Sequence, residues 1–155
     1  MTESDSTDPR IFHLVYVSSA IRQINNVELR KIKKTAQQNN KRAHVTGVLL
    51  YCNGKFMQFL EGPELQVRRI FSAIKSDTRH CKINVLKEGF IPQRQFSEWN
   101  MRYTPLGDVQ NHQGVIFNKL FDLATCTKKT LAYASESMSF LLAFKTSNIS
   151  YRKAC

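Results

Sequence analysis

Two β-prone runs of sequence meet at Asn53-Gly54: Val45-Thr46-Gly47-Val48-Leu49-Leu50-Tyr51 comes before the pair, and Lys55-Phe56-Met57-Gln58-Phe59-Leu60-Glu61-Gly62 follows it. Asn and Gly tolerate the positive φ angles of a tight mirror-image turn, so the sequence predicts a β-hairpin. Side chains alternate between the two faces of a strand, which leaves Gln58 among apolar neighbours on either face. A buried amide costs about 1–3 kcal/mol for each unpaired donor or acceptor. Gln58 therefore needs a polar partner: a neighbouring strand, ordered water or a ligand.

Strand and helix patterns flank this hairpin on both sides. The predicted elements are a strand at 11–17, a helix from Asn25 or Asn26 to Asn39-Asn40, the hairpin, a helix that opens at 62–64 and closes at 77–80, and strands at 83–90 and 99–103. Asn39-Asn40 are expected to end the first helix, because Asn tolerates the left-handed conformation common after a helix C-terminus. The order strand, helix, strand, strand, helix, strand, strand is the split-βαβ pattern of ferredoxin-like α+β domains, whose two helices cover one face of the sheet.

The two ends of the chain differ from this central pattern. Residues 1–10 are polar and acidic and predict a flexible leader, while residues 11–105 form the expected domain. Residues 106–155 predict a C-terminal extension with two short helices, at 113–125 and 128–145, and a loose polar tail. The apolar positions of these helices must be buried, and we expect them to pack on the sheet face that the first two helices leave uncovered.

Composition limits the classes of function. The formal charge is +11, which attracts anionic partners, but the Lys and Arg residues are spread over several segments and favour a solvated surface over a dedicated nucleic-acid patch. No apolar run is long enough to cross a bilayer, and the start does not resemble a secretory signal. The four cysteines are scattered, which argues against a metal site or a disulfide framework. We expect a cytoplasmic protein with reduced thiols.

No catalytic set stands out, so the chain is not expected to be an enzyme. There is no Gly-rich phosphate loop, no nucleophile elbow and no paired carboxylates, and the histidines occur singly. Polar residues do fall at the edges of the predicted two-helix layer. They are Tyr16, Asn39, Asn40, Gln58, Arg79 and His80. Each has a structural explanation, such as a core phenol or a helix terminus, yet together they could line a slot for a flat ligand that forms hydrogen bonds.

A series of motifs runs in order through residues 11–105. They are Leu14-Val15-Tyr16-Val17-Ser18-Ser19, Asn39-Asn40, Thr46-Gly47-Val48-Leu49, Phe56-Met57-Gln58-Phe59-Leu60-Glu61-Gly62, Asp77-Thr78-Arg79-His80 and Phe96-Ser97-Glu98-Trp99-Asn100-Met101. In this order they resemble the motifs of BLUF domains, blue-light sensors that use FAD. The Gln-x-Leu-Glu-Gly element, with a Tyr and an Asn upstream, is the most specific part of the resemblance.

The resemblance implies a binding mode and a photochemical role for particular residues. The flavin ring would lie between the two helices, clamped by Ile32 and Ile74. Asn40 would bind its polar edge, Asn39 would border it, and Arg79 and His80 would lie near the phosphate side. Tyr16 and Gln58 would be the photoactive pair: the phenol gives and regains an electron and a proton, and the Gln58 amide rotates or tautomerises. The hydrogen bond to the flavin then changes, and the absorption shifts red.

The resemblance also implies how the signal leaves the domain. Trp99 and Met101 on the last strand would carry it, either of them facing Gln58, and the terminal helices would pass it to a separate partner protein of acidic character. A homo-oligomer is a further option. The alternatives are a basic ferredoxin-like module that binds nucleic acid or an acidic protein without responding to light, and a flavin oxidoreductase.

Overall fold

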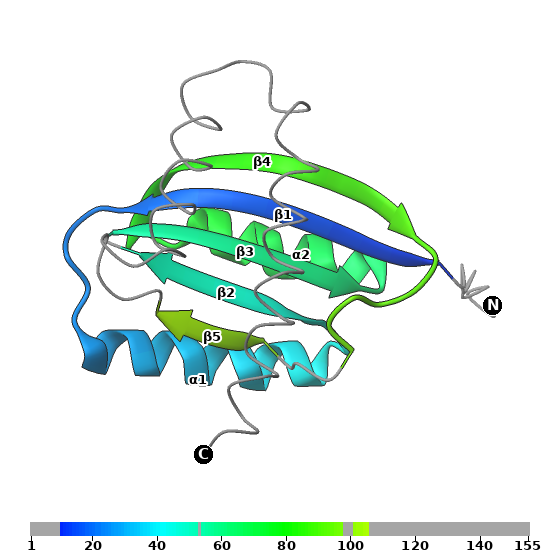
Figure 1. The fold of residues 1–155 in the computed structure, drawn as a ribbon, viewed down its shortest axis with the longest axis horizontal. Helices are drawn as coiled ribbons and strands as arrows, with labels where there is room; N and C mark the ends of the chain where they lie inside the picture. Colours follow the sequence, from blue (N-terminus) through cyan, green and yellow to red (C-terminus); the bar gives the residue numbers. More distant parts are fainter. Residues whose placement is uncertain (1–9, 53, 98–100, 106–155) are drawn as a thin grey trace, which may run out of the picture.

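The computed structural model describes residues 10–52, 54–97 and 101–105 (Figure 1). Its elements are β1 (Ile11–Ala20), α1 (Asn26–Arg42), β2 (Thr46–Cys52), β3 (Lys55–Gly62), α2 (Glu64–Ser76), β4 (His80–Ile91) and β5 (Arg102–Pro105). This order confirms the predicted α+β fold. The expected leader, Trp99 and the extension from residue 106, with its helices at 113–125 and 128–145, lie outside the described residues, except that Arg10 is described.

The sheet places β3 at its centre. Its strand order is β4-β1-β3-β2-β5, with β3 antiparallel to both β1 and β2, β4 antiparallel to β1, and β5 parallel to β2. The strands β1 and β2 therefore run in the same direction with β3 between them, as the split-βαβ pattern requires. In the β1–β3 register Tyr16 lies directly opposite Gln58.

Both helices pack on the same face of the sheet. Leu29 of α1 and Phe71 of α2 belong to one buried cluster with Leu14, Tyr16 and Leu60. The opposite face is also apolar and buried, with Val15, Val17, Leu50, Met57 and Phe59. The alternation seen in the sequence thus produces two apolar faces. Neither helix in the part of the chain that the structure describes is long and apolar enough to cross a membrane.

The beginning of α1 follows its sequence closely, and its end does not. Asn25 accepts a hydrogen bond from the backbone N–H of Glu28 at 2.9 Å, and the Glu28 side chain accepts one from the backbone N–H of Asn25, which is a capping box. The prediction that Asn39-Asn40 end the helix is wrong. The Ala43 N–H still bonds to the Asn39 carbonyl, so α1 continues to Arg42, and the left-handed residue is His44, with φ 55°.

Two strand boundaries also differ from the prediction. The strand β4 begins at His80 rather than at 83, because pairing with β1 continues past register shifts at Val15/Tyr16 and Val17/Ser19. Such irregularities interrupt the alternation that a sequence pattern relies on. The strand expected at 99–103 is observed as β5, which begins at Arg102. Met101 precedes it with φ 67°, a conformation incompatible with a strand.

A buried carboxylate anchors the connection between β4 and β5. Glu61 is fully buried, and it accepts hydrogen bonds from the Thr46 hydroxyl at 2.9 Å and from the backbone N–H groups of Gln95 and Phe96, each at 2.7 Å. The guanidinium of Arg94 donates to the Thr46 hydroxyl and to the His44 carbonyl. This network holds the chain that leads to Met101 against the central hairpin.

Replacing Glu61 by alanine is expected to lower the free energy of unfolding by about 3 kcal/mol or more, because hydrogen bonds to a charged group contribute about 1.5–3 kcal/mol each. Urea denaturation would measure it. The matched control is Glu88→Ala: the Glu88 side chain is 48% exposed and lies 3.8 Å from Arg68, so its loss should cost about 0–1 kcal/mol. Equal effects of the two substitutions would contradict the anchoring role.

Candidate functional site

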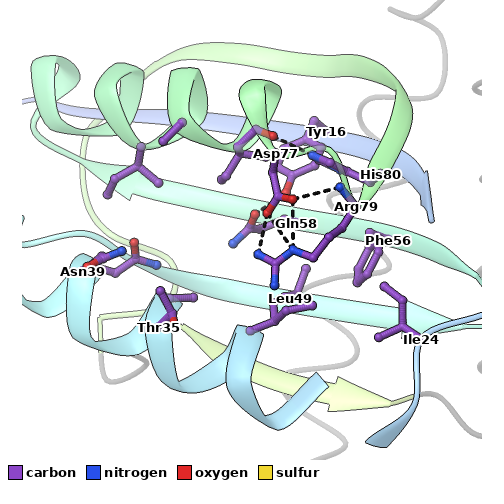
Figure 2. A pocket seen from close by; sticks show the side chains of 16 residues that line it. Tyr16, Ile24, Thr35, Asn39, Leu49, Phe56, Gln58, Asp77, Arg79 and His80 are labelled. Carbon is purple, nitrogen blue, oxygen red and sulfur yellow. Dashed lines mark hydrogen bonds and ion pairs between the residues drawn. The ribbon is translucent and has the colours of Figure 1, made fainter. Parts of the chain in front are cut away.

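A pocket lies between α1 and α2, over the face of the sheet that the helices cover (Figure 2). Its cavity volume is about 230 Å³, and it opens to solvent. The lining includes every residue that the sequence suggested for flavin binding: Tyr16, Ile32, Asn39, Asn40, Gln58, Ile74, Arg79 and His80.

The walls of the pocket are apolar and come from both helices. Ile32 and Ala36 line it from α1, and Ile70 and Ile74 line it from α2, while Leu49 of β2 contributes from the sheet. All these side chains are aliphatic, so they offer dispersion contacts to the two faces of a flat ring without competing for its polar edge. The pocket therefore suits a planar ligand held between the helices.

Tyr16 and Gln58 form a hydrogen-bonded pair that lines this pocket. The Tyr16 hydroxyl donates to Gln58 Oε1, and Gln58 Nε2 lies 3.1 Å from the Met101 sulfur, its acceptor. Tyr16 and Gln58 are each 3% exposed. The polar partner that Gln58 requires is thus the phenol on the neighbouring strand, with the thioether as a second, weaker one. Of the two residues expected to carry the signal, Met101 contacts Gln58, while Trp99 lies outside the described residues.

The Tyr16 phenol is protonated at physiological pH. Burial raises its pKa above the usual value, and the negative charge of Asp77 raises it further. A neutral phenol keeps its O–H as a donor to the Gln58 amide.

Asn40 has a donor with no protein partner. Its side chain is 1% exposed and lines the pocket, and the Nδ2 group finds no hydrogen-bond acceptor among the described residues. A buried, unpaired N–H group is unfavourable unless a ligand or water meets it. The carbonyl groups at the edge of a flavin ring would supply the missing acceptor, so the residues present fit a flavin.

An ion pair lines the pocket just after the C-terminal end of α2. The Arg79 guanidinium binds the Asp77 carboxylate through Nε at 2.9 Å and Nη2 at 2.5 Å, with Arg79 about half exposed (Figure 2). This hydrogen bonding lowers the pKa of Asp77. An exposed pair of this kind is weak, so Arg79 can exchange the carboxylate for another anion.

His80 is held by the protein itself. One ring nitrogen, Nε2, lies 2.6 Å from the Ile74 carbonyl and donates to it, and Nδ1 lies 2.8 Å from the Ser18 hydroxyl. The ring also meets Phe56 edge-on at a centroid distance of 6.4 Å. His80 thus ties the end of α2 to β1 and closes one side of the pocket.

Two contacts at the site are not predicted from the sequence. Asp77 is expected at the end of the second helix and within a family motif, but its ion pair with Arg79 is not predicted. Gln37 of α1 donates to the Met101 carbonyl at 3.3 Å, and this contact between residues 64 positions apart could not be read from a local pattern. The described residues contain no group of side chains suited to a metal ion.

Comparison with known proteins identifies this arrangement. The family described as "Sensors of blue-light using FAD" matches residues 11–102. Curated relatives include the photoactivated adenylate cyclase subunit beta of Euglena gracilis, 31% identical over 127 residues, and the blue light- and temperature-regulated antirepressor BluF of Escherichia coli K12, 33% identical over 118 residues. Each alignment covers 76% of this chain, but only 15% and 28% of those proteins respectively.

Solved structures agree with the sequence relatives. The photo-activated state of BlsA is 27% identical with a TM-score of 0.66, and the match covers 85% of this chain and 94% of that one. The dark state of BlrB, a BLUF protein, is 25% identical with a TM-score of 0.65, covering 83% and 95%. Because the family match spans well over half of the sequence, the chain belongs to the BLUF family, the sensors of blue light using FAD.

Proposed function

We propose that this protein is a blue-light photoreceptor that binds FAD between α1 and α2 and uses Tyr16 and Gln58 as its photoactive pair. The observation that carries the proposal is the buried Tyr16–Gln58 hydrogen bond beside a pocket with apolar walls. A phenol is a competent donor of an electron and a proton, and an amide has two chemically distinct ends. The pair therefore combines a donor of an electron and a proton with an amide that can adopt two distinguishable orientations.

The chain would hold the flavin by three kinds of contact. Ile32 and Ile74 would pack on the two faces of the ring, and Asn40 Nδ2 would donate to a ring carbonyl, with Asn39 beside it. Arg79 would bind a phosphate group after releasing Asp77, at the end of the pocket that His80 closes. The bound flavin supplies absorption of blue light and an excited state that accepts an electron.

The response lies in the Gln58 amide. Tyr16 would lose and regain the proton at its hydroxyl while Gln58 rotates or tautomerises. In the arrangement described, Oε1 accepts from Tyr16 and Nε2 faces the Met101 sulfur. A half-turn of the amide would direct Oε1 at the sulfur, which has no proton to donate, and Nε2 at the phenol. The two orientations thus have different hydrogen bonds, which is what a switch between two states requires.

The signal would leave through Met101 and β5, with Trp99 nearby in sequence, and reach a separate partner protein rather than a catalytic site of its own. One relative is named an antirepressor, which favours a protein partner. The exposed side of α1 carries five basic residues: Arg30, Lys31, Lys34, Lys41 and Arg42. None of these five forms an ion pair with another described residue. An acidic partner suits this surface. The partner could also be a second copy of the chain. The exposed thiol of Cys81 suits the reducing cytoplasm.

The visible spectrum of the purified protein before and after a blue flash tests the proposal. We expect a bound-flavin spectrum that shifts slightly red and returns in the dark, and chromatography of the flavin released by denaturation should identify FAD rather than FMN. A colourless protein that takes up no added FAD would contradict it. The basic side of α1 favours nucleic-acid binding as the second candidate, which predicts affinity that falls steeply with salt and ignores light.

A further inference from the structure

The side chain and the backbone carbonyl of Met101 are each hydrogen-bonded to a different element of the fold. Its sulfur lies 3.1 Å from Gln58 Nε2 on β3, and its backbone carbonyl accepts a hydrogen bond from Gln37 Nε2 on α1 at 3.3 Å. Met101 is fully buried, and Gln37 is half-buried. A single residue thus connects the photoactive amide to a helix on the surface of the molecule.

The backbone of Met101 is in a conformation that its surroundings must enforce. Its φ of 67° lies in the left-handed region, which is unfavourable for a residue with a side chain. Its side chain approaches the backbone of Gly47 so closely that a Cβ added there would lie 3.2 Å from the Met101 methyl carbon. Met101 directly precedes β5, which pairs with β2 and is an edge strand of the sheet formed by the described residues. A residue held this way can relax when one of its restraints is lost.

We propose that Gln37 is a positioning residue that restores Met101, and through it Gln58, to the arrangement described here, and so sets how long the light-induced state lasts. The inference rests on the proposed photoreceptor function. When the amide turns, Oε1 faces the Met101 sulfur, and these two acceptors do not attract each other. The side chain of Met101 then shifts, while the Gln37 hydrogen bond keeps its carbonyl close to α1. That restraint favours the return of the sulfur to Gln58 Nε2.

The test measures the rate of dark recovery after a blue flash in Gln37→Met, which keeps the length of the side chain and removes the donor. Recovery should slow by about threefold to tenfold, because without this hydrogen bond the backbone of Met101 is no longer held where its sulfur returns to Gln58. The matched control is Gln38→Met, the same substitution at the exposed neighbouring residue, which should recover like the wild type. Gln37→Lys, which retains a donor of sufficient reach, should restore most of the rate.

Further readouts separate this role from a merely structural one. Flavin content, the dark spectrum and the melting temperature of Gln37→Met should match those of Gln38→Met. In a Met101→Leu background, which lacks the sulfur, Gln37→Met should have little further effect on recovery, because the two residues act in series. If Gln37→Met recovers as fast as the wild type or faster, the inference is overturned. The photoreceptor function still holds in that case, provided that the wild-type protein shows its reversible red shift. A wild-type protein with no reversible shift overturns both.

Discussion

Replacing Gln58 by leucine is expected to abolish the light-induced red shift while the flavin remains bound. Leucine is close in size and fills the same space between Phe56 and Leu60 on β3, so the apolar walls from Ile32 and Ile74 are preserved. It offers neither an acceptor to the Tyr16 hydroxyl nor a donor to the Met101 sulfur, both of which Gln58 supplies. Without an amide that can turn, the two states have no difference in hydrogen bonding to display.

Difference spectra recorded before and after a blue flash check this expectation. The matched control is Gln93→Leu, which changes an exposed glutamine in the connection between β4 and β5 and should leave the shift unchanged. Stability will fall in Gln58→Leu, by about 1–3 kcal/mol for the Tyr16 hydroxyl left without its acceptor. The comparison is therefore made on protein with confirmed flavin content. A shift of wild-type size in Gln58→Leu would remove this residue from the mechanism.

The sequence specifies most of the fold because the signals are local. The Asn53-Gly54 pair, the alternation in the two flanking strands and the capping box at Asn25 each involve residues within a few positions of one another. The order of elements then leaves few arrangements of the sheet. The predicted end of α1 is wrong, because the Ala43 N–H continues the helical hydrogen bonding and His44 takes the left-handed conformation. The general tolerance of Asn for that conformation does not show which residue adopts it.

The candidate site is predicted by family resemblance far more than by pattern. Periodicity places Tyr16 and Gln58 on strands, but only the observed β1–β3 register puts them opposite each other. The Glu61 network and the Gln37–Met101 hydrogen bond join residues 15 to 64 positions apart. Contacts of this range depend on how the sheet assembles and on where a connection crosses it. The local sequence around either residue does not predict them.

Replacing Tyr16 by phenylalanine is expected to eliminate the normal photocycle, through the loss of one oxygen atom. The ring would keep its place, because it packs against Phe71 at a centroid distance of 5.3 Å and is almost fully buried. What disappears is the O–H that donates to Gln58 Oε1, and with it the neutral phenol that burial keeps protonated by raising the pKa of Tyr16. The Gln58 amide would then have no phenol donor beside it, and of its two described hydrogen bonds the weaker one, from Nε2 to the Met101 sulfur, would alone favour its present orientation.

The control for this substitution is Tyr51→Phe, the same change at a second buried tyrosine. Tyr51 lies on β2, packs against Phe56 at 4.9 Å, and its hydroxyl has no hydrogen-bond partner in the part of the chain that the structure describes. Tyr51→Phe should therefore fold, bind flavin and respond to light, and it removes a buried hydroxyl that nothing satisfies. Transient absorption after a flash, compared between the two variants, isolates the role of the Tyr16 hydroxyl. If both variants recovered with wild-type amplitude and rate, the electron and proton would have to come from another side chain, and the Tyr16–Gln58 bond would be only a structural contact.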